Sequence, residues 1–139
     1  MTELAAAKLD MLLVEPVTLL RRTVALTARS LGLANVHEAA SNILAERLLK
    51  SQRFHGAVIA IDGAGAAPAL ELLDRVRSGN SISDAGMPIA VMADHCDAAL
   101  LAALQARGVS RIILKPFRAR ALIDTITDLG NTSSGIRRS

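Results

Sequence analysis

Short apolar stretches alternate with stretches of helical spacing along almost the whole of this 139-residue chain. The apolar stretches are residues 9–14, 35–38, 57–61, 88–93 and 109–114. In the segments that follow them, apolar residues recur at intervals of three and four, as on the buried face of a helix. Parallel strands need crossover connections of this kind. The alternation therefore predicts an α/β fold, with a five-stranded parallel sheet covered by five helices on its two faces.

Residues that favour helix ends support this division. Pro16 and Pro68 suit the first turn of a helix, where the missing N–H costs nothing. Ser41 is a candidate N-cap, and the acidic residues from Asp94 onward complement the positive end of a helix dipole. The five helices are therefore expected to begin near Pro16, Ser41, Pro68, Asp94 and Arg118.

The composition indicates a single globular domain. About half of the residues are apolar (51%), but no apolar run approaches the roughly 18 residues of a membrane span. The first residues lack the pattern of a secretory signal, and the one cysteine, Cys96, cannot form an internal disulfide. We expect a cytoplasmic protein without membrane contact, with an N-terminal extension (1–7), one domain (8–129) and a disordered tail (130–139).

The C-terminal third of the chain is strongly basic. From position 98 onward it holds seven basic residues against two acidic ones. Such a region can bind an acidic protein or a nucleic acid, or it can be a solvated face followed by a basic tail. No aromatic residues alternate with the basic ones to stack on bases, which makes nucleic acid the less favoured partner.

Other motifs give little support to catalysis. Residues 63–68 (GAGAAP) follow a strand and precede a helix, but the third glycine of a dinucleotide-binding fingerprint is replaced by Pro68. His37, His55 and His95 lie in three separate segments, without the spacing of zinc ligands. We therefore expect a binding protein and not an enzyme.

Four short segments occur in an order that is typical of one known family. They are residues 12–15 (LLVE), 19–22 (LLRR), 70–73 (LELL) and 108–117, which begins with GVS and ends with KPF. With these segments the chain resembles the receiver domain of bacterial two-component response regulators, over roughly residues 8–129.

The resemblance implies a flavodoxin-like fold with strand order 2-1-3-4-5 and a role as the switch of a phosphorelay. In that family, a histidine kinase transfers a phosphoryl group to an aspartate at the end of strand three. Two acids after strand one hold Mg²⁺. A Ser or Thr after strand four and a lysine after strand five contact the phosphoryl group.

Carried over residue by residue, the resemblance implies a depleted pocket. Lys115 matches the family lysine and Glu15 matches the first acid, but Pro16 stands in place of the second. Ile61 aligns with the phosphoacceptor, Asp62 follows one residue later, and Ala93 replaces the Ser or Thr. Lys115 either pairs with a functional acid or is held in an ion pair with Glu15 or Asp62, and both alternatives stay open.

These departures favour a degenerate receiver that acts through protein contacts without efficient aspartyl phosphorylation. The first alternative is an active receiver phosphorylated on Asp62, with Mg²⁺ held weakly by Glu15 and Asp62 as the only cofactor. A shift of one residue in the glycine-rich loop would bring Asp62 into the pocket. The second alternative is a nucleic-acid accessory factor that uses the basic C-terminal third.

The resemblance also implies an interaction surface on the fourth helix, the fifth strand and the fifth helix. Its partner would be a histidine kinase or a downstream effector, and pairing of two copies through the last helices is a further expectation. The residues predicted for this surface are Ala99, Ala103, Arg107, Arg111, Ile113, Arg118 and Leu122.

Overall fold

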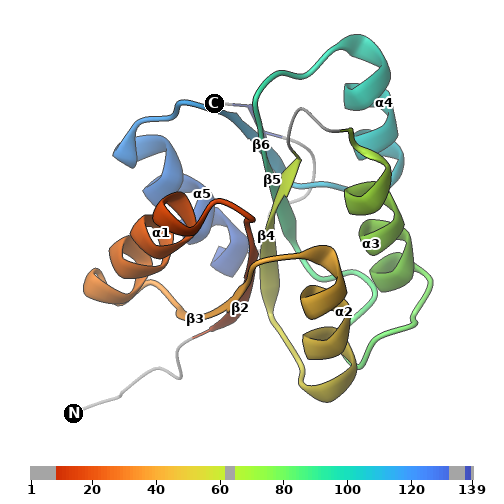
Figure 1. The fold of residues 1–139 in the computed structure, drawn as a ribbon, viewed down its shortest axis with the longest axis horizontal. Coiled ribbons are helices and arrows are strands. Elements are labelled where there is room, and N and C mark those ends of the chain that lie inside the picture. Colours follow the sequence, from red (N-terminus) through yellow and green to blue (C-terminus); the bar gives the residue numbers. More distant parts are fainter. Residues whose placement is uncertain (1–8, 62–64, 132–136, 139) are drawn as a thin grey trace.

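The computed structural model describes residues 9–61, 65–131 and 137–138, which form a twisted parallel sheet between two layers of helices (Figure 1). The sheet has the order β3-β2-β4-β5-β6-β7, and every pair of neighbours is parallel. The first five strands in the chain therefore have the order 2-1-3-4-5, which confirms the predicted fold. The strands are β2 (Asp10–Val14), β3 (Asn35–Ala39), β4 (Gly56–Ile61), β5 (Ile89–Ala93), β6 (Arg111–Leu114) and β7 (Arg137–Arg138).

Five helices connect or follow these strands and cover both faces of the sheet. Helices α1 and α5 pack on one face, and α2, α3 and α4 pack on the other (Figure 1). None of the helices in the described part of the chain is long and apolar enough to cross a membrane. The helices are α1 (Thr18–Ser30), α2 (Asn42–Ser51), α3 (Ala67–Arg77), α4 (Ala98–Ala106) and α5 (Ala119–Asn131).

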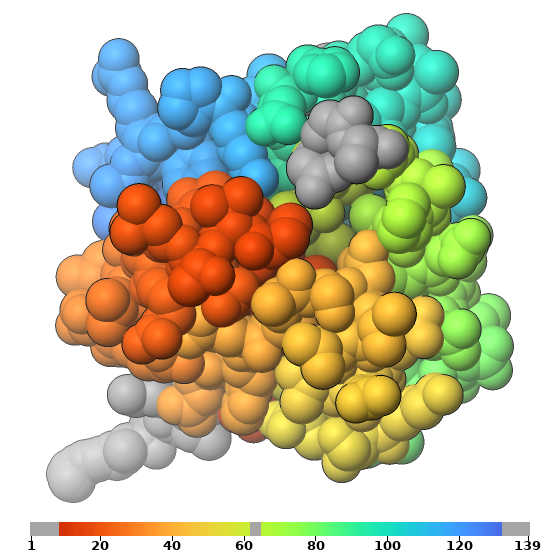
Figure 2. Space-filling view, in the orientation of Figure 1, coloured from red at the N-terminus to blue at the C-terminus, as the bar shows by residue number. Residues whose placement is uncertain are grey.

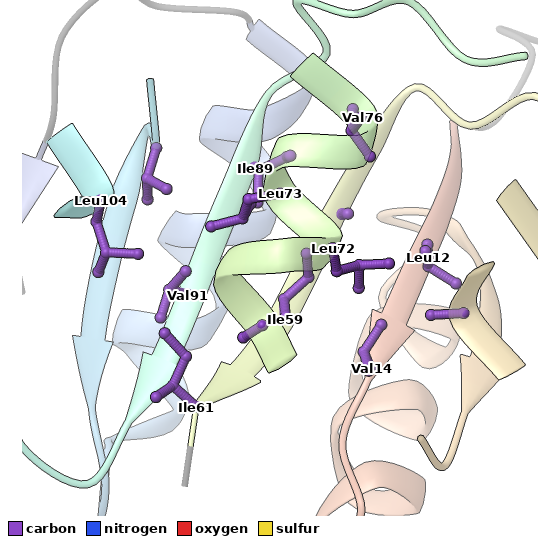
Figure 3. Packing of buried hydrophobic residues seen from close by; sticks show 14 of the residues in the cluster. Leu12, Val14, Ile59, Ile61, Leu72, Leu73, Val76, Ile89, Val91 and Leu104 are labelled. Atoms are coloured by element: carbon purple, nitrogen blue, oxygen red, sulfur yellow. The ribbon is translucent and has the colours of Figure 1, made fainter. Parts of the chain in front are cut away.

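Alternate residues of each central strand enter the two halves of the core. Leu12 and Val14 of β2 pack with α2 and α3 (Figure 3), whereas Met11 and Leu13 pack with α1 and α5. All six residues of β4 are buried. Because both faces of these strands are covered, their sequences are continuously apolar and do not alternate with polar residues.

Four of the five expected helix starts agree with the structure, including the one near Arg118, where α5 begins at Ala119, and one does not. The Ser41 hydroxyl accepts a hydrogen bond from the Leu44 amide at 3.2 Å, which confirms it as an N-cap. Pro68 lies in the first turn of α3, and α4 begins at the acidic segment, where Asp97 is the N-cap. The placement of Pro16 in a helix was wrong. Helix α1 starts two residues later, at Thr18.

The C-terminal end departs from the predicted disorder of residues 130–139. Helix α5 continues to Asn131, and Arg137–Arg138 add a sixth strand beside β6. In this pairing Arg111 lies opposite Arg137 and Ile112 lies opposite Arg138. Residues 132–136 and 139, and the expected extension at residues 1–7, lie outside the described residues.

Arg77, at the end of α3, connects two loops. These loops lie at the amino-terminal ends of the strands, opposite to the strand carboxyl ends. The Arg77 guanidinium donates hydrogen bonds of 2.7 Å to the carbonyl oxygens of Ala85, Met87 and Arg107, and one of 3.2 Å to Gly108. Burial lowers the pKa of Arg77 from its ordinary value, and the Asp84 carboxylate opposes this shift. One side chain therefore holds the segments that lead into β5 and β6.

Candidate functional site

The residues that the resemblance assigns to the pocket gather at the carboxyl ends of four strands. Glu15 directly follows β2, Ile61 ends β4, Ala93 ends β5 and Lys115 directly follows β6. The Lys115 amide donates to the Ala93 carbonyl oxygen at 2.7 Å, which extends the pairing of β5 and β6 by one step. The register of the sheet thus brings the predicted residues together at the carboxyl ends of the strands.

Glu15 and Lys115 form a direct ion pair in this pocket. The Lys115 Nζ lies 2.7 Å from Glu15 Oε1, and the side chains are 15% and 0% exposed. The second carboxylate oxygen, Oε2, accepts a hydrogen bond from the Val17 amide at 3.0 Å. Both oxygens of Glu15 therefore have partners from the chain itself. The ion pair fits a functional Lys115 as well as a remnant, so both alternatives stay predictions.

The Glu15 contact also explains where α1 begins. Its carboxylate takes the amide of Val17, the N-cap residue, and no side chain caps the helix from the N-cap position itself. Arg21, in the first turns of α1, donates to the Glu15 carbonyl oxygen at 3.0 Å. Pro16 is exposed in the turn between them and offers no ligand atom to the pocket.

The last residues of β4 and β5 are apolar, and the exposed Asp94 directly follows β5. Ile61 is 5% exposed and Ala93 is fully buried, so neither a nucleophile nor a hydroxyl projects from these two positions. Ile61 lines a cavity of about 360 Å³ together with Asp94, His95 and Asp97. A separate cavity of about 280 Å³ opens between the starts of α1, α2 and α3 (Figure 2). The residues that line it, all in the described part of the chain, include no carboxylate. They are Val14, Pro16, Ala40, Ser41, Asn42, Ala60, Gly65, Pro68 and Ala69.

The residues present do not fit a Mg²⁺ site well. Mg²⁺ prefers carboxylate oxygens in octahedral geometry. Of the described carboxylates that directly follow strands here, Asp94 is exposed and Glu15 is already paired with Lys115. Asp62, predicted as a second ligand and as the alternative phosphoacceptor, lies outside the described residues.

His37 and His55 lie away from this pocket, whereas His95 lines the cavity that Ile61 and Asp94 also line. His37 Nε2 is 3.1 Å from an Asp10 carboxylate oxygen, and the Asp10 amide is 3.0 Å from His55 Nδ1, both at the amino-terminal end of β2. His95 is exposed after β5. Within residues 9–61, 65–131 and 137–138, no three His, Cys, Asp or Glu side chains are placed to hold a metal ion.

Solved structures that superpose well on this chain include receiver domains. A CheY-like response regulator receiver domain protein from Methanospirillum hungatei superposes with a TM-score of 0.78 at 18% identity, over 90% of this chain and 96% of that one. The chemotaxis protein CheY4 of Vibrio cholerae gives 0.77 at 20% identity, over 88% and 99% of the two chains. This chain has the receiver fold.

A third structure, a signal receiver domain of a two-component histidine kinase from Clostridium thermocellum, gives a TM-score of 0.77 at 17% identity. It covers 88% of this chain and 98% of that one. No family model matches the sequence, and no curated protein matches it. The similarity to receivers therefore lies in the backbone, while most of the side chains have diverged.

Two residues that were predicted for the interaction surface are buried in the structure. Ile113 is fully buried and Leu122 is 3% exposed, because both point into the core layer between the sheet and α5. Arg118 is exposed, as is Ala99 on α4. Arg107 pairs with Asp74 at 2.8 Å, and Arg111 pairs with Asp128 at 2.7 Å. Sequence reasoning missed Leu114, which is 45% exposed at the end of β6.

Proposed function

We propose that this chain is a receiver-like signalling protein that acts by contact with other proteins and is not efficiently phosphorylated on aspartate. The observation that carries the proposal is the closed Glu15–Lys115 pair. Phosphoryl transfer on a receiver needs a nucleophile, a metal site and a free cation for the transferred group. In this pocket the Lys115 ammonium group is already paired with the Glu15 carboxylate.

The scaffold is complete, although Pro16, Ile61 and Ala93 stand where the resemblance expects reactive side chains. All five strand–helix units are present, and about 90% of the chain superposes on a receiver domain. Conservation of the shape without the reactive side chains favours a function of the surface. We propose a cytoplasmic protein partner, either a histidine kinase or a downstream effector, which contacts exposed residues of α4, β6 and α5.

The proposal is tested by the intact mass of the protein after incubation with Mg²⁺ and acetyl phosphate. We expect no phosphoryl adduct on the unmodified chain. An adduct that disappears in the Asp62→Ala variant would overturn the proposal and establish an active receiver with its acceptor one residue late. An adduct that persists in Asp62→Ala would point to another residue and would equally contradict it.

A second prediction concerns Mg²⁺ alone. A site with a millimolar Kd, at ten times that concentration of metal, would raise the free energy of unfolding by about 1.4 kcal/mol. We expect no such gain in thermal melts followed by circular dichroism, because Glu15 is already paired. Sodium chloride at matched ionic strength is the control. A Mg²⁺-specific gain that is lost in Glu15→Gln would contradict the prediction.

A further inference from the structure

The outer edge of β6 is only partly covered. Strand β7 pairs with Arg111 and Ile112, and within the described residues nothing pairs with the outer side of Ile113 and Leu114. An uncovered strand edge presents unpaired N–H and C=O groups, which can accept a further strand. The pairing of β7 shows that this edge accepts a parallel strand.

A cavity of about 490 Å³ adjoins the uncovered part of β6. Its walls are apolar where Leu114, Pro116 and Phe117 meet Ala121 of α5. Leu114 is 45% exposed, and Phe117 is partly buried against the core between the sheet and α5. The cavity is wide enough to receive one large apolar side chain from a strand that lies along β6.

The rim of this cavity carries a surplus of positive charge. Arg120 has only a loose contact with Asp124, at 3.8 Å with both side chains largely exposed. Arg118 is exposed, and no acidic side chain among the described residues lies within ion-pair distance of it.

We propose that this edge of β6 is a strand-addition site for an extended, acidic segment of a partner protein, which replaces β7 and inserts an apolar side chain beside Leu114 and Phe117. Main-chain hydrogen bonds would supply affinity, and the cavity and its basic rim would supply specificity. The inference rests on the proposed function, because it specifies the partner of the same face.

Strand β7 is suited to being replaced. It contributes two residues, whereas strands in stable sheets usually have several more. A longer segment gains pairing at Ile113 and Leu114, which β7 leaves uncovered within the described residues.

The probe is a fluorescein-labelled peptide of alternating Glu or Asp and Val or Leu residues, measured by fluorescence anisotropy with the full chain. We expect binding that weakens about tenfold in Arg118→Glu, because one rim charge is reversed. The matched control is Arg53→Glu, an exposed arginine before β4, which should leave the Kd unchanged. Equal weakening in both variants would show a nonspecific charge effect and overturn the proposal.

Two further arms separate strand addition from simple charge attraction. The same peptide with alternate backbone nitrogens methylated keeps its charge but cannot pair with β6, and it should not bind. The double variant Arg137→Pro and Arg138→Pro should bind the unmethylated peptide more tightly than Arg137→Gln and Arg138→Gln, which keeps both amides for pairing. Binding of the methylated peptide, or equal Kd values for the two double variants, would refute strand addition.

These outcomes are independent of the phosphodonor experiment. A chain that forms no phosphoryl adduct and does not bind the peptide would retain the proposed function and lose this inference. A chain that binds the peptide and also forms an adduct on Asp62 would retain the strand-addition site. The proposal that the protein acts without aspartyl phosphorylation would then be lost.

Discussion

Replacing Lys115 with methionine is expected to lower the free energy of unfolding by about 3–5 kcal/mol, the usual cost of breaking one side of a buried ion pair. Glu15 is fully buried, and without the ammonium group only the Val17 amide would remain to stabilise its charge. Urea unfolding followed by far-ultraviolet circular dichroism measures the change. Fluorescence is unsuitable because the chain has no tryptophan and no tyrosine.

A double-mutant cycle provides the control for this prediction. The pair Glu15→Leu and Lys115→Met replaces both charges with apolar side chains of similar size, so it should be clearly more stable than Lys115→Met alone. This result would show that Lys115→Met is destabilised by the unpaired, buried Glu15 carboxylate and not by lost packing of the lysine side chain. Additive effects of the two substitutions would show that the 2.7 Å contact contributes no coupling.

Replacing Arg77 with methionine is the second large effect, with an expected loss of about 2–4 kcal/mol, since four carbonyl oxygens lose a charged donor. Three of these bonds are 2.7 Å long, and they tie α3 to the loops that enter β5 and β6. Methionine keeps much of the aliphatic packing, so the loss should report mainly on the guanidinium. The measurement is the same urea titration.

Arg47→Met is the matched control for Arg77. Arg47 is exposed on α2, and its loss should change the free energy of unfolding by less than about 0.5 kcal/mol, as is usual for surface positions. If Arg77→Met were as mild as Arg47→Met, the carbonyl oxygens around it would have to be satisfied by water, and Arg77 would not hold the loops.

The sheet could be predicted from the sequence because strands that are buried on both faces consist almost entirely of apolar residues. Residues 57–61 and 88–93 are almost wholly apolar, and in the structure β4 and β5 lie in the centre of the sheet. The N-cap at Ser41 could also be predicted, because its hydroxyl only has to accept a hydrogen bond from the amide three residues later. Both signals depend on neighbours in the chain.

The features that escaped prediction depend on contacts between distant segments. Pro16 fits a first helical turn by its own preference, but the Glu15 carboxylate takes the Val17 amide and delays α1 to Thr18. The bonds of Arg77 reach across to residues 85–108, and β7 pairs two arginines that carry no strand pattern. The burial of Ile113 follows from which face of β6 is covered by α5, which no local pattern specifies.

The ion pair has a consequence for how the chain folds. Glu15 and Lys115 are 100 positions apart, so the contact closes a loop that contains almost the entire domain. Contacts of such high sequence separation form late, after shorter loops have closed. Until β6 docks beside β5, a partly assembled sheet has to bury the Glu15 charge without its counter-ion or leave that end of β2 open. Docking of β6 removes this penalty. Partly folded species that lack the C-terminal third should therefore be unstable, and the domain should fold as one cooperative unit.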